Sequence, residues 1–532
     1  DIHGYPYPFL RSGWIVGWSG MDDFWQKSKI DFKHGVASGD PTNTHIILWT
    51  RVTPSKPSIG KLNVEYQVSK DVNFTNIVSI GTLKADIDRD FTVKVDVDLS
   101  KHQPGTNFFY RFKCEDSLSP VGQTKTLPQK NLKHFKIAVF SCSNYPAGYF
   151  NAYKDAAKDK SIDLALHLGD YLYEYKMGDY ATENAENLSR VPIPFSELKS
   201  LSDYRIRHAQ YKSDLDAQLL HASFPMIPIW DDHEVANNSY KTGAQNHQEN
   251  EGFFLSRKRN ALKAYFEWMP VRDIQRFGSF YKNFKIGDLV NLQVLESRLS
   301  SREKQISYDD FIDKDAGLNK EKFLKELNKE RELIGQNQLD KVRKNTSNKY
   351  TWNVIAQQVL LSKLKLPDLP EIILENIPAG YEYFRTIIKD DLPYNLDSWD
   401  GYPNERRKLL SYLKNKGQIL FLAGDSHNCW AGNIKDDQDH FIGVEFGAPS
   451  VTSPGTSEAT GELFPIKILE NMVVNKNDDL VWTNLLNRGY VTIDFTREIA
   501  KTRFIGLSQV KNKNYSREVL KEFIVEKNKE II

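Results

Sequence analysis

The stretch that decides the fold is His167-Leu168-Gly169-Asp170-Tyr171-Leu172-Tyr173, which ends an apolar run starting at Asp163 with a carboxylate and two phenols. The run has the length and composition of a buried strand. Three more runs end in polar side chains in the same way: Lys136 to Phe140 before Ser141-Cys142-Ser143-Asn144, Phe224 to Trp230 before Asp231-Asp232-His233-Glu234, and Gln418 to Ala423 before Gly424-Asp425-Ser426-His427. Because α/β proteins bind ligands beyond the carboxyl ends of their strands, these four strand ends predict one pocket.

The composition predicts a globular protein of about two to four domains, because 532 residues with 40% hydrophobic side chains are enough for a large core. Its 71 Lys and Arg residues balance 70 Asp and Glu residues, so no nucleic-acid-binding surface is evident and an anionic ligand must be bound by local groups. No run approaches the ~18 apolar residues of a transmembrane segment. The sequence does not specify an oligomeric state.

The start of the chain, Asp1-Ile2-His3-Gly4, is interpreted as the mature end of an exported protein, periplasmic, cell-surface or secreted, from which a signal peptide has been removed. The odd number of cysteines (Cys114, Cys142 and Cys429) leaves at least one thiol free or bound to metal. A disulfide between Cys114 and Cys429 remains an open alternative.

The hydrophobic pattern divides the chain into three parts. Residues 1–31 form an aromatic-rich segment that we expect to pack on the catalytic domain, with contact to a membrane as an open alternative. Residues 32–130 contain six short β-rich runs without helical periodicity, which predicts a β-sandwich of immunoglobulin or fibronectin type. Residues 131–532 alternate strands with helical stretches, which predicts a layered α/β domain. Within it, a Lys-rich insertion near 305–350 is expected to form exposed helices, and Tyr515 to Ile532 an amphipathic C-terminal helix.

The polar residues at the strand ends predict a metal centre. The carboxylates of Asp170, Asp232 and Asp425 would repel one another in one pocket unless a cation neutralised them. Hard oxygen ligands suit calcium, magnesium or ferric iron, whereas the Cys142 thiolate and the Tyr173 phenolate indicate a transition metal. The set therefore predicts two kinds of metal ion. His167, inside a strand, is interpreted as a hydrogen-bonded core residue, and Asp31, Asp40 and Asp397 are interpreted as turn formers.

Several longer motifs carry a family resemblance. They are Gly35-Val36-Ala37-Ser38-Gly39-Asp40-Pro41, Ile47-Leu48-Trp49-Thr50-Arg51-Val52, Ser141-Cys142-Ser143, Gly169-Asp170-Tyr171-Leu172-Tyr173-Glu174, Trp230-Asp231-Asp232-His233-Glu234, Asp397-Ser398-Trp399-Asp400-Gly401-Tyr402 and Gly424-Asp425-Ser426-His427. In this order they resemble the PhoD-like alkaline phosphatases, from about residue 33 to 500. The resemblance implies a metallophosphatase catalytic domain, a β-sandwich flanked by helices that is similar to that of purple acid phosphatases.

The resemblance also implies a ligand set. Cys142, Asp170, Tyr173 and His427 would hold Fe3+, and Asp170 would bridge to Ca2+ held by Asp232 and Asp425, with Asn238 as a further candidate. The chain departs from the family at Glu296-Ser297-Arg298, where Asp-Thr-Arg is common.

The predicted function is that of a metal-dependent phosphoesterase, an alkaline phosphatase or phosphodiesterase acting on phosphate mono- or diesters. A metal-bound hydroxide would attack phosphorus, and His233, next to Asp232, would protonate the leaving alkoxide. Because guanidinium groups match phosphate in shape and charge, four arginines are candidates for binding it: Arg205, Arg207, Arg257 and Arg298.

Two other classes of function remain open. One is a non-catalytic surface or adhesion protein that binds calcium through the carboxylates, although such a site needs neither Tyr173, His233 nor Cys142. The other is a dinuclear zinc hydrolase acting on a non-phosphate ester, which the carboxylate-rich and histidine-poor ligand set disfavours.

Overall fold

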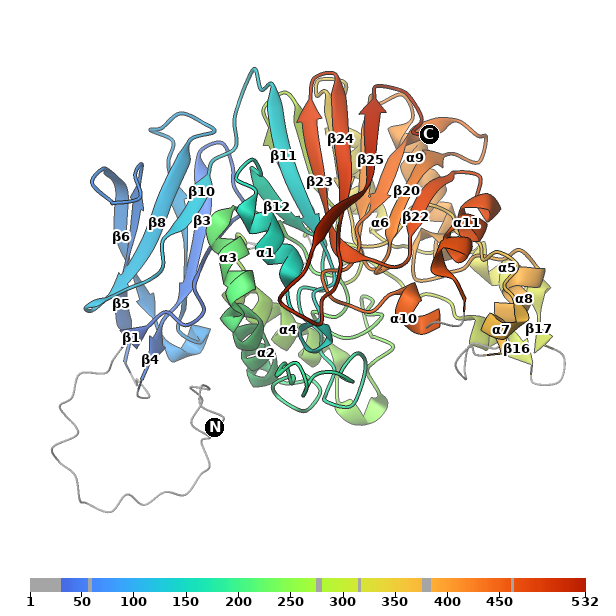
Figure 1. The fold of residues 1–532 in the computed structure, drawn as a ribbon, viewed down its shortest axis with the longest axis horizontal. Coiled ribbons are helices and arrows are strands. Elements are labelled where there is room, and N and C mark those ends of the chain that lie inside the picture. Colours follow the sequence, from blue (N-terminus) through green and yellow to red (C-terminus); the bar gives the residue numbers. More distant parts are fainter. Residues whose placement is uncertain (1–29, 56–59, 274–279, 314–316, 376–383, 461–463) are drawn as a thin grey trace, which may run out of the picture.

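The computed structural model describes residues 30–55, 60–273, 280–313, 317–375, 384–460 and 464–532 (Figure 1). The predicted aromatic-rich segment 1–31 lies outside the described residues except for its last two, so its packing stays a prediction. Within the described ranges, no helix has both the length and the hydropathy that a membrane crossing requires.

The predicted N-terminal β-sandwich is confirmed. One of its sheets contains β5 (Leu62–Ser69), β6 (Ile77–Ala85), β8 (Asn107–Cys114), β9 (Ser117–Leu118) and β10 (Gly122–Lys125). The facing strands are β2 (Val36–Gly39), β3 (His45–Arg51) and β7 (Thr92–Asp98), and the short strands β1 (Ile30–Asp31) and β4 (Thr53–Pro54) pair with each other. Alternate side chains of the two layers, including Leu48, Val68 and Phe112, form one buried cluster.

The sandwich is not separated from the catalytic domain at the level of its sheets. Strand β2 pairs in parallel with β13 (Met226–Pro228) through Gly39 and Met226. As a result, β2, β3 and β7 form one edge of a nine-stranded sheet that continues through the catalytic domain. This pairing joins residues nearly 190 positions apart in the chain, so no local pattern could have predicted it.

The catalytic domain has the predicted layered architecture. Its first sheet contains β11 (His134–Phe140), β12 (Leu164–His167), β13, β23 (Arg488–Thr496), β24 (Ile499–Leu507) and β25 (Arg517–Glu526). Its second sheet has the order β14 (Lys282–Ile286), β15 (Val290–Val294), β18 (Trp352–Ala356), β19 (Ile419–Ala423), β21 (Phe441–Gly447), β20 (Cys429–Lys435) and β22 (Leu480–Asn484). Side chains of both sheets, such as Val139, Leu166, Val354 and Leu420, share one core.

Helices cover this pair of sheets. Four of them, α1 (Asn151–Lys158), α2 (Leu201–Ser213), α3 (Leu215–Ser223) and α4 (Phe254–Trp268), add buried side chains to the shared core and lie beside the first sheet in Figure 1. Two others, α6 (Gly335–Asn345) and α9 (Pro403–Leu413), pack on the second sheet through Leu339, Val342 and Leu409. The other α-helices within the described residues are α5 (Lys320–Leu327), α7 (Glu371–Leu374), α8 (Phe384–Lys389), α10 (Thr456–Thr460) and α11 (Ile466–Lys476). In addition, β16 (Ile312–Asp313) pairs with β17 (Gly317–Leu318).

The predicted C-terminal helix is wrong, because residues 517–526 form strand β25. It pairs antiparallel with β24 along its whole length and completes the edge of the first sheet. The apolar positions alternate as a strand requires: Phe523 and Val525 are buried, whereas Ile524 between them is exposed. The spacing of Val519, Leu520, Phe523 and Ile524 is compatible with a helix and with a strand. The segment forms a strand because the edge of β24 is free to pair with it.

Two further predictions meet different outcomes. The Lys-rich insertion is helical as predicted, yet α5 is anchored by Phe323 and Leu327 in a small core of its own, and α6 packs on the second sheet. The alternative of a disulfide between Cys114 and Cys429 is wrong, because both thiols are buried and free.

Candidate metal centre

The four predicted strand ends meet at one place. Strands β11, β12 and β13 run parallel, so their carboxyl ends lie at the same end of the first sheet. The residues that follow these strands, Cys142, Asp170 and Asp232, therefore lie close together. Strand β19 of the second sheet brings Asp425 and His427 to them. The ligand atoms form three groups whose members lie within 4.8 Å of one another: Cys142, Asp170 and His427; Asp170, Asp232 and His233; and Asp170, Asp231, Asp232 and Asp425. Asp170 belongs to all three.

A strained backbone conformation marks the same residues. Five of the predicted metal ligands have positive φ angles, between 52° and 62°: Cys142, Asp170, Asn238, Asp425 and His427. Residues other than glycine rarely adopt this left-handed conformation, and where they do the strain is commonly associated with function. At a strand end this conformation turns the chain sharply, so that the side chain projects into the space beyond the sheet.

Gly169 allows the turn after β12. Its φ of +105° disfavours any residue with a side chain, and a Cβ atom there would lie 2.4 Å from the backbone nitrogen of Asp231. The close approach lets the β12 and β13 turns lie against each other, which brings Asp170 and Asp232 into one group.

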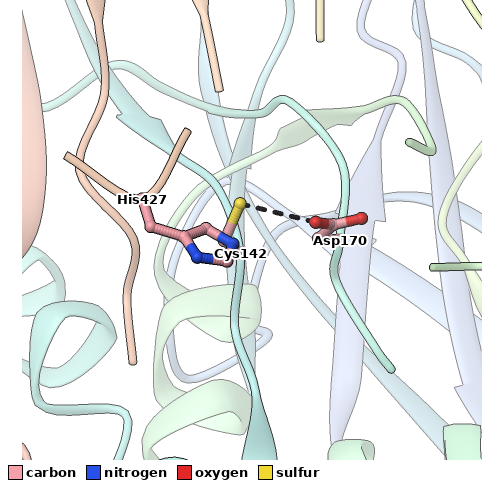
Figure 2. A group of neighbouring side chains, drawn as sticks. All are labelled: Cys142, Asp170 and His427. Atoms are coloured by element: carbon pink, nitrogen blue, oxygen red, sulfur yellow. Dashed lines mark hydrogen bonds between the residues drawn. The ribbon is translucent and has the colours of Figure 1, made fainter. Parts of the chain in front are cut away.

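A thiol, a phenol and an imidazole surround one side of Asp170. The Cys142 Sγ atom lies 3.6 Å from Asp170 Oδ2, and the Tyr173 hydroxyl donates to the same oxygen at 3.2 Å. Figure 2 shows the Cys142 sulfur between Asp170 and the His427 ring. His427 Nδ1 donates to the carbonyl of Pro454 at 2.7 Å, which leaves Nε2 as the acceptor, 3.3 Å from the Tyr173 hydroxyl. The tautomer is the one that a metal ligand needs.

Carboxylates surround the other side of Asp170. Asp231, Asp232 and Asp425 converge there, and Arg298 inserts its guanidinium group among them. This arginine is fully buried; its Nη2 lies 3.2 Å from Asp425 and 3.4 Å from Asp232, and its Nε donates to Asp231. One guanidinium charge therefore faces two buried carboxylates, Asp231 and Asp232, and two half-buried ones, Asp397 and Asp425.

The protein's own groups leave most of these carboxylates undercompensated; the exception is Asp232, whose pKa Arg298 and His233 lower to about 2 against the effect of burial. Asp231 Oδ2 and Asp232 Oδ1 are buried and accept no hydrogen bond. Burial raises the pKa of Asp425 to about 7 despite Arg298, and burial likewise raises the pKa of Asp170 and of Asp231 well above the ordinary range. Buried ionised carboxylates need cations. The oxygen-rich group therefore suits a hard divalent cation, and the thiol and phenol group suits a transition metal.

His233 is held by an ion pair with Glu174. The His233 Nδ1 atom lies 2.7 Å from Glu174 Oε2, and its ring stacks on Tyr173 with centroids 4.3 Å apart. This contact leaves Nε2 directed to the carboxylate side, 4.0 Å from Asp232 Oδ2. Asn238, five residues after His233, donates its backbone N–H to the same Asp232 oxygen.

Of the four candidate arginines, only Arg298 lies at the centre. Arg205 forms an ion pair with Glu267, and Arg257 forms one with Glu197. Arg207 donates to backbone carbonyls, including that of Tyr173, so it holds the backbone of a predicted metal ligand. The prediction that Arg205, Arg207 or Arg257 binds phosphate is therefore corrected: their guanidinium groups are used in packing and ion pairs away from the carboxylates.

Several residues of the centre were not predicted as parts of it. Asp231 and Glu174 adjoin predicted residues, Asp232 and Tyr173, and their proximity was the available signal. Asp397, read as a turn former, accepts from Arg298 Nη1 at 2.9 Å and also from Arg302. The available signal was that Asp397 begins one of the motifs that carry the family resemblance; its partners are 99 and 95 positions away. His167 is a buried core residue bonded to the Tyr153 hydroxyl, as predicted.

Removing the metal ions should make stability depend on pH in a defined direction. Without cations, burial raises the pKa of Asp425 to about 7, so between about pH 4 and pH 7 the folded chain holds a proton that the unfolded chain has lost. The free energy of unfolding of the metal-free protein must therefore fall as pH rises through this window. We expect the Tm gap between metal-loaded and chelator-treated protein to widen from pH 5 to pH 7 in thermal melts. A gap that stays constant would contradict the assignment of these carboxylates to a cation site.

Comparisons with known proteins agree with this geometry. A family model described as "PhoD-like phosphatase" matches residues 137–504, and one described as "PhoD-like phosphatase, N-terminal domain" matches residues 20–128. Alkaline phosphatase D of Bacillus subtilis (strain 168) is 35% identical over 450 residues, which cover 80% of this chain and 70% of that protein. A solved structure of PhoD superposes with a TM-score of 0.76 at 30% identity, covering 93% of this chain and 90% of that one. The chain therefore belongs to the PhoD-like phosphatase family.

Proposed function

We propose that this protein is a metal-dependent phosphoesterase that hydrolyses phosphate mono- or diesters. Fe3+ would be held by Cys142, Asp170, Tyr173 and His427, and Ca2+ by Asp170, Asp232 and Asp425 together with Asn238. The observation that carries the proposal is the position of Asp170, the one residue shared by all three groups of ligand atoms, where a single carboxylate can serve two metal ions. The family match supports the phosphoesterase class.

The metal ions, when bound, would neutralise phosphoryl oxygens and lower the pKa of a water molecule toward neutrality. The chain's own residues position the remaining groups. Arg298 holds Asp231, Asp397 and Asp425 in fixed orientations. The Pro454 carbonyl fixes the tautomer of His427, and Glu174 orients the His233 ring and favours its protonated form. His233 Nε2 is then free to give a proton to the alkoxide oxygen that leaves phosphorus.

The His233 role predicts a leaving-group effect. For the His233→Ala variant we expect kcat/KM to fall about 10²- to 10⁴-fold for alkyl phosphate esters, whose alkoxides need a proton, and much less for nitrophenyl esters. The metal content should stay unchanged, and His440→Ala, at a surface histidine, serves as the control. Equal losses on both ester types would remove His233 from the acid role.

Elemental analysis combined with assays tests the proposal as a whole. We expect near-stoichiometric iron together with calcium in the purified protein, hydrolysis of nitrophenyl phosphate esters, and loss of that activity on chelation with recovery when both metals are restored. Calcium alone with no hydrolysis would favour a calcium-binding surface protein. Zinc alone would require the ligand roles to be reassigned.

We also propose that the protein acts outside the cytoplasm, as its resemblance to the PhoD-like phosphatases implies. Cell fractionation followed by an immunoblot tests this proposal. Recovery of the protein only from the cytoplasmic fraction would contradict it.

A further inference from the structure

An apolar cavity opens from the candidate metal centre. It has a volume of about 520 Å³, within the roughly 300–1,000 Å³ of typical small-molecule sites. One end is formed by Asp425, His427 and Tyr180. The cavity is therefore continuous with two of the predicted metal ligands and reaches away from them into the protein.

The wall of the cavity away from the metal centre consists of apolar side chains. Leu360 and Leu364, which follow β18, face Trp430 of β20 and the α11 residues Leu469 and Val473. These side chains are buried and belong to one hydrophobic cluster, so their positions are set by packing. An apolar ligand group would bury further surface against them.

The polar groups near the metal end are used within the protein. The indole N–H of Trp430 donates to Ser426 Oγ at 2.8 Å, and the Asn428 side-chain amide donates to Thr456 Oγ1 at 3.0 Å. Lys365, at the rim, forms an ion pair with Asp391. A sugar or nucleoside in the cavity would place its hydroxyl groups against leucine side chains, where they would lose their hydrogen bonds to water.

We infer that this cavity binds an apolar alkyl or aryl group of the substrate, attached to the phosphate that lies at the metal centre. The inference rests on the proposed phosphoesterase function and specifies its substrate class, a phosphate ester with a hydrocarbon substituent. We assign an apolar occupant because the cavity begins beside Asp425 and His427 and its lining away from them is mostly apolar, including Leu360, Leu364 and Trp430.

Binding of alkylphosphonates to the metal-loaded protein tests the inference without turnover. We expect calorimetric affinity to rise about fourfold for each methylene from methyl- to butyl- to hexylphosphonate, the usual gain for burying a CH2 group. Hydrolysis of methyl nitrophenyl phosphate, measured separately, reports the proposed function. Flat affinity along the series in an active enzyme overturns the inference and leaves the function standing. Absence of hydrolysis of this and every other ester overturns the function and the inference with it.

Two variants of helix α11 locate the effect. Val473→Phe narrows the cavity, and we expect it to reduce the preference for hexyl- over methylphosphonate at least fivefold while methylphosphonate still binds. The control is Ile468→Phe, the same type of enlargement on an exposed residue of α11 that does not line the cavity. Because the preference is a ratio within each variant, a partly folded preparation does not change it. An unchanged ratio in Val473→Phe overturns the inference.

Discussion

Replacing Asp170 with asparagine is expected to remove both metal binding and catalysis. Asp170 is shared by all three groups of ligand atoms and touches both the Cys142 thiol and the Tyr173 phenol, so its loss affects every proposed ion. Asparagine keeps the size of the side chain but removes the charge. Metal ions contribute several kcal/mol of transition-state stabilisation, so we expect kcat/KM to fall by about 10³-fold or more, together with the iron and calcium content.

The matched control for this prediction is Asp40→Asn. Asp40 is also a buried aspartate with a positive φ, but it pairs with Lys282 outside the metal centre. This variant should melt at a lower temperature and still bind its full metal content. If Asp170→Asn retains both metals and activity while Asp40→Asn behaves as expected, the centre has been assigned to the wrong residues.

Replacing Arg298 with methionine should cost the metal-free protein about 3–5 kcal/mol of stability. Arg298 is fully buried and its guanidinium group contacts Asp231, Asp397 and Asp425. Removing one partner of a buried ion-pair network leaves uncompensated charge, which is the source of this cost. In the metal-loaded protein the cations supply part of the missing positive charge, so the loss should be smaller. Thermal melts with and without a chelator measure both values.

Arg205→Met is the control for the Arg298 variant, because it removes a guanidinium group from an ion pair with Glu267 at a distance from the metal centre. Its effect should not depend on the chelator. A large increase in KM for phosphate esters with unchanged stability in both conditions would contradict this structural role and assign Arg298 to phosphate binding.

The ligands could be predicted from sequence because each of them follows its strand directly. Asp170 follows β12 and Asp232 follows β13, and these parallel strands bring their carboxyl ends to the same end of the first sheet. Asp425 follows β19 of the second sheet, which packs against the first. The chemistry of the residues then indicated metal ions, and the resemblance to a family named which ones. The β-sandwich was predictable for a similar reason, since its strands alternate polar and apolar residues locally.

The partners of those ligands could not be predicted, because they come from distant positions. Nothing in the sequence connects Asp397 with Arg298 or Glu174 with His233, and three of the four candidate arginines were equivalent to Arg298 until their ion pairs were visible. The sequence shows that an arginine is charged, but it does not show which carboxylates the guanidinium group contacts.

The sequence by itself determined the order of the elements, the positions of the strand ends and the kinds of ligand atom, because these depend on runs of a few consecutive residues. Only the tertiary structure decided that residues 517–526 form a strand, that one sheet joins both domains, and that an apolar cavity adjoins Asp425 and His427. Each of these features depends on contacts between segments that are far apart in the sequence. Residues 517–526 pair with the open edge of β24, β2 pairs with β13, and the cavity lies between β20 and α11.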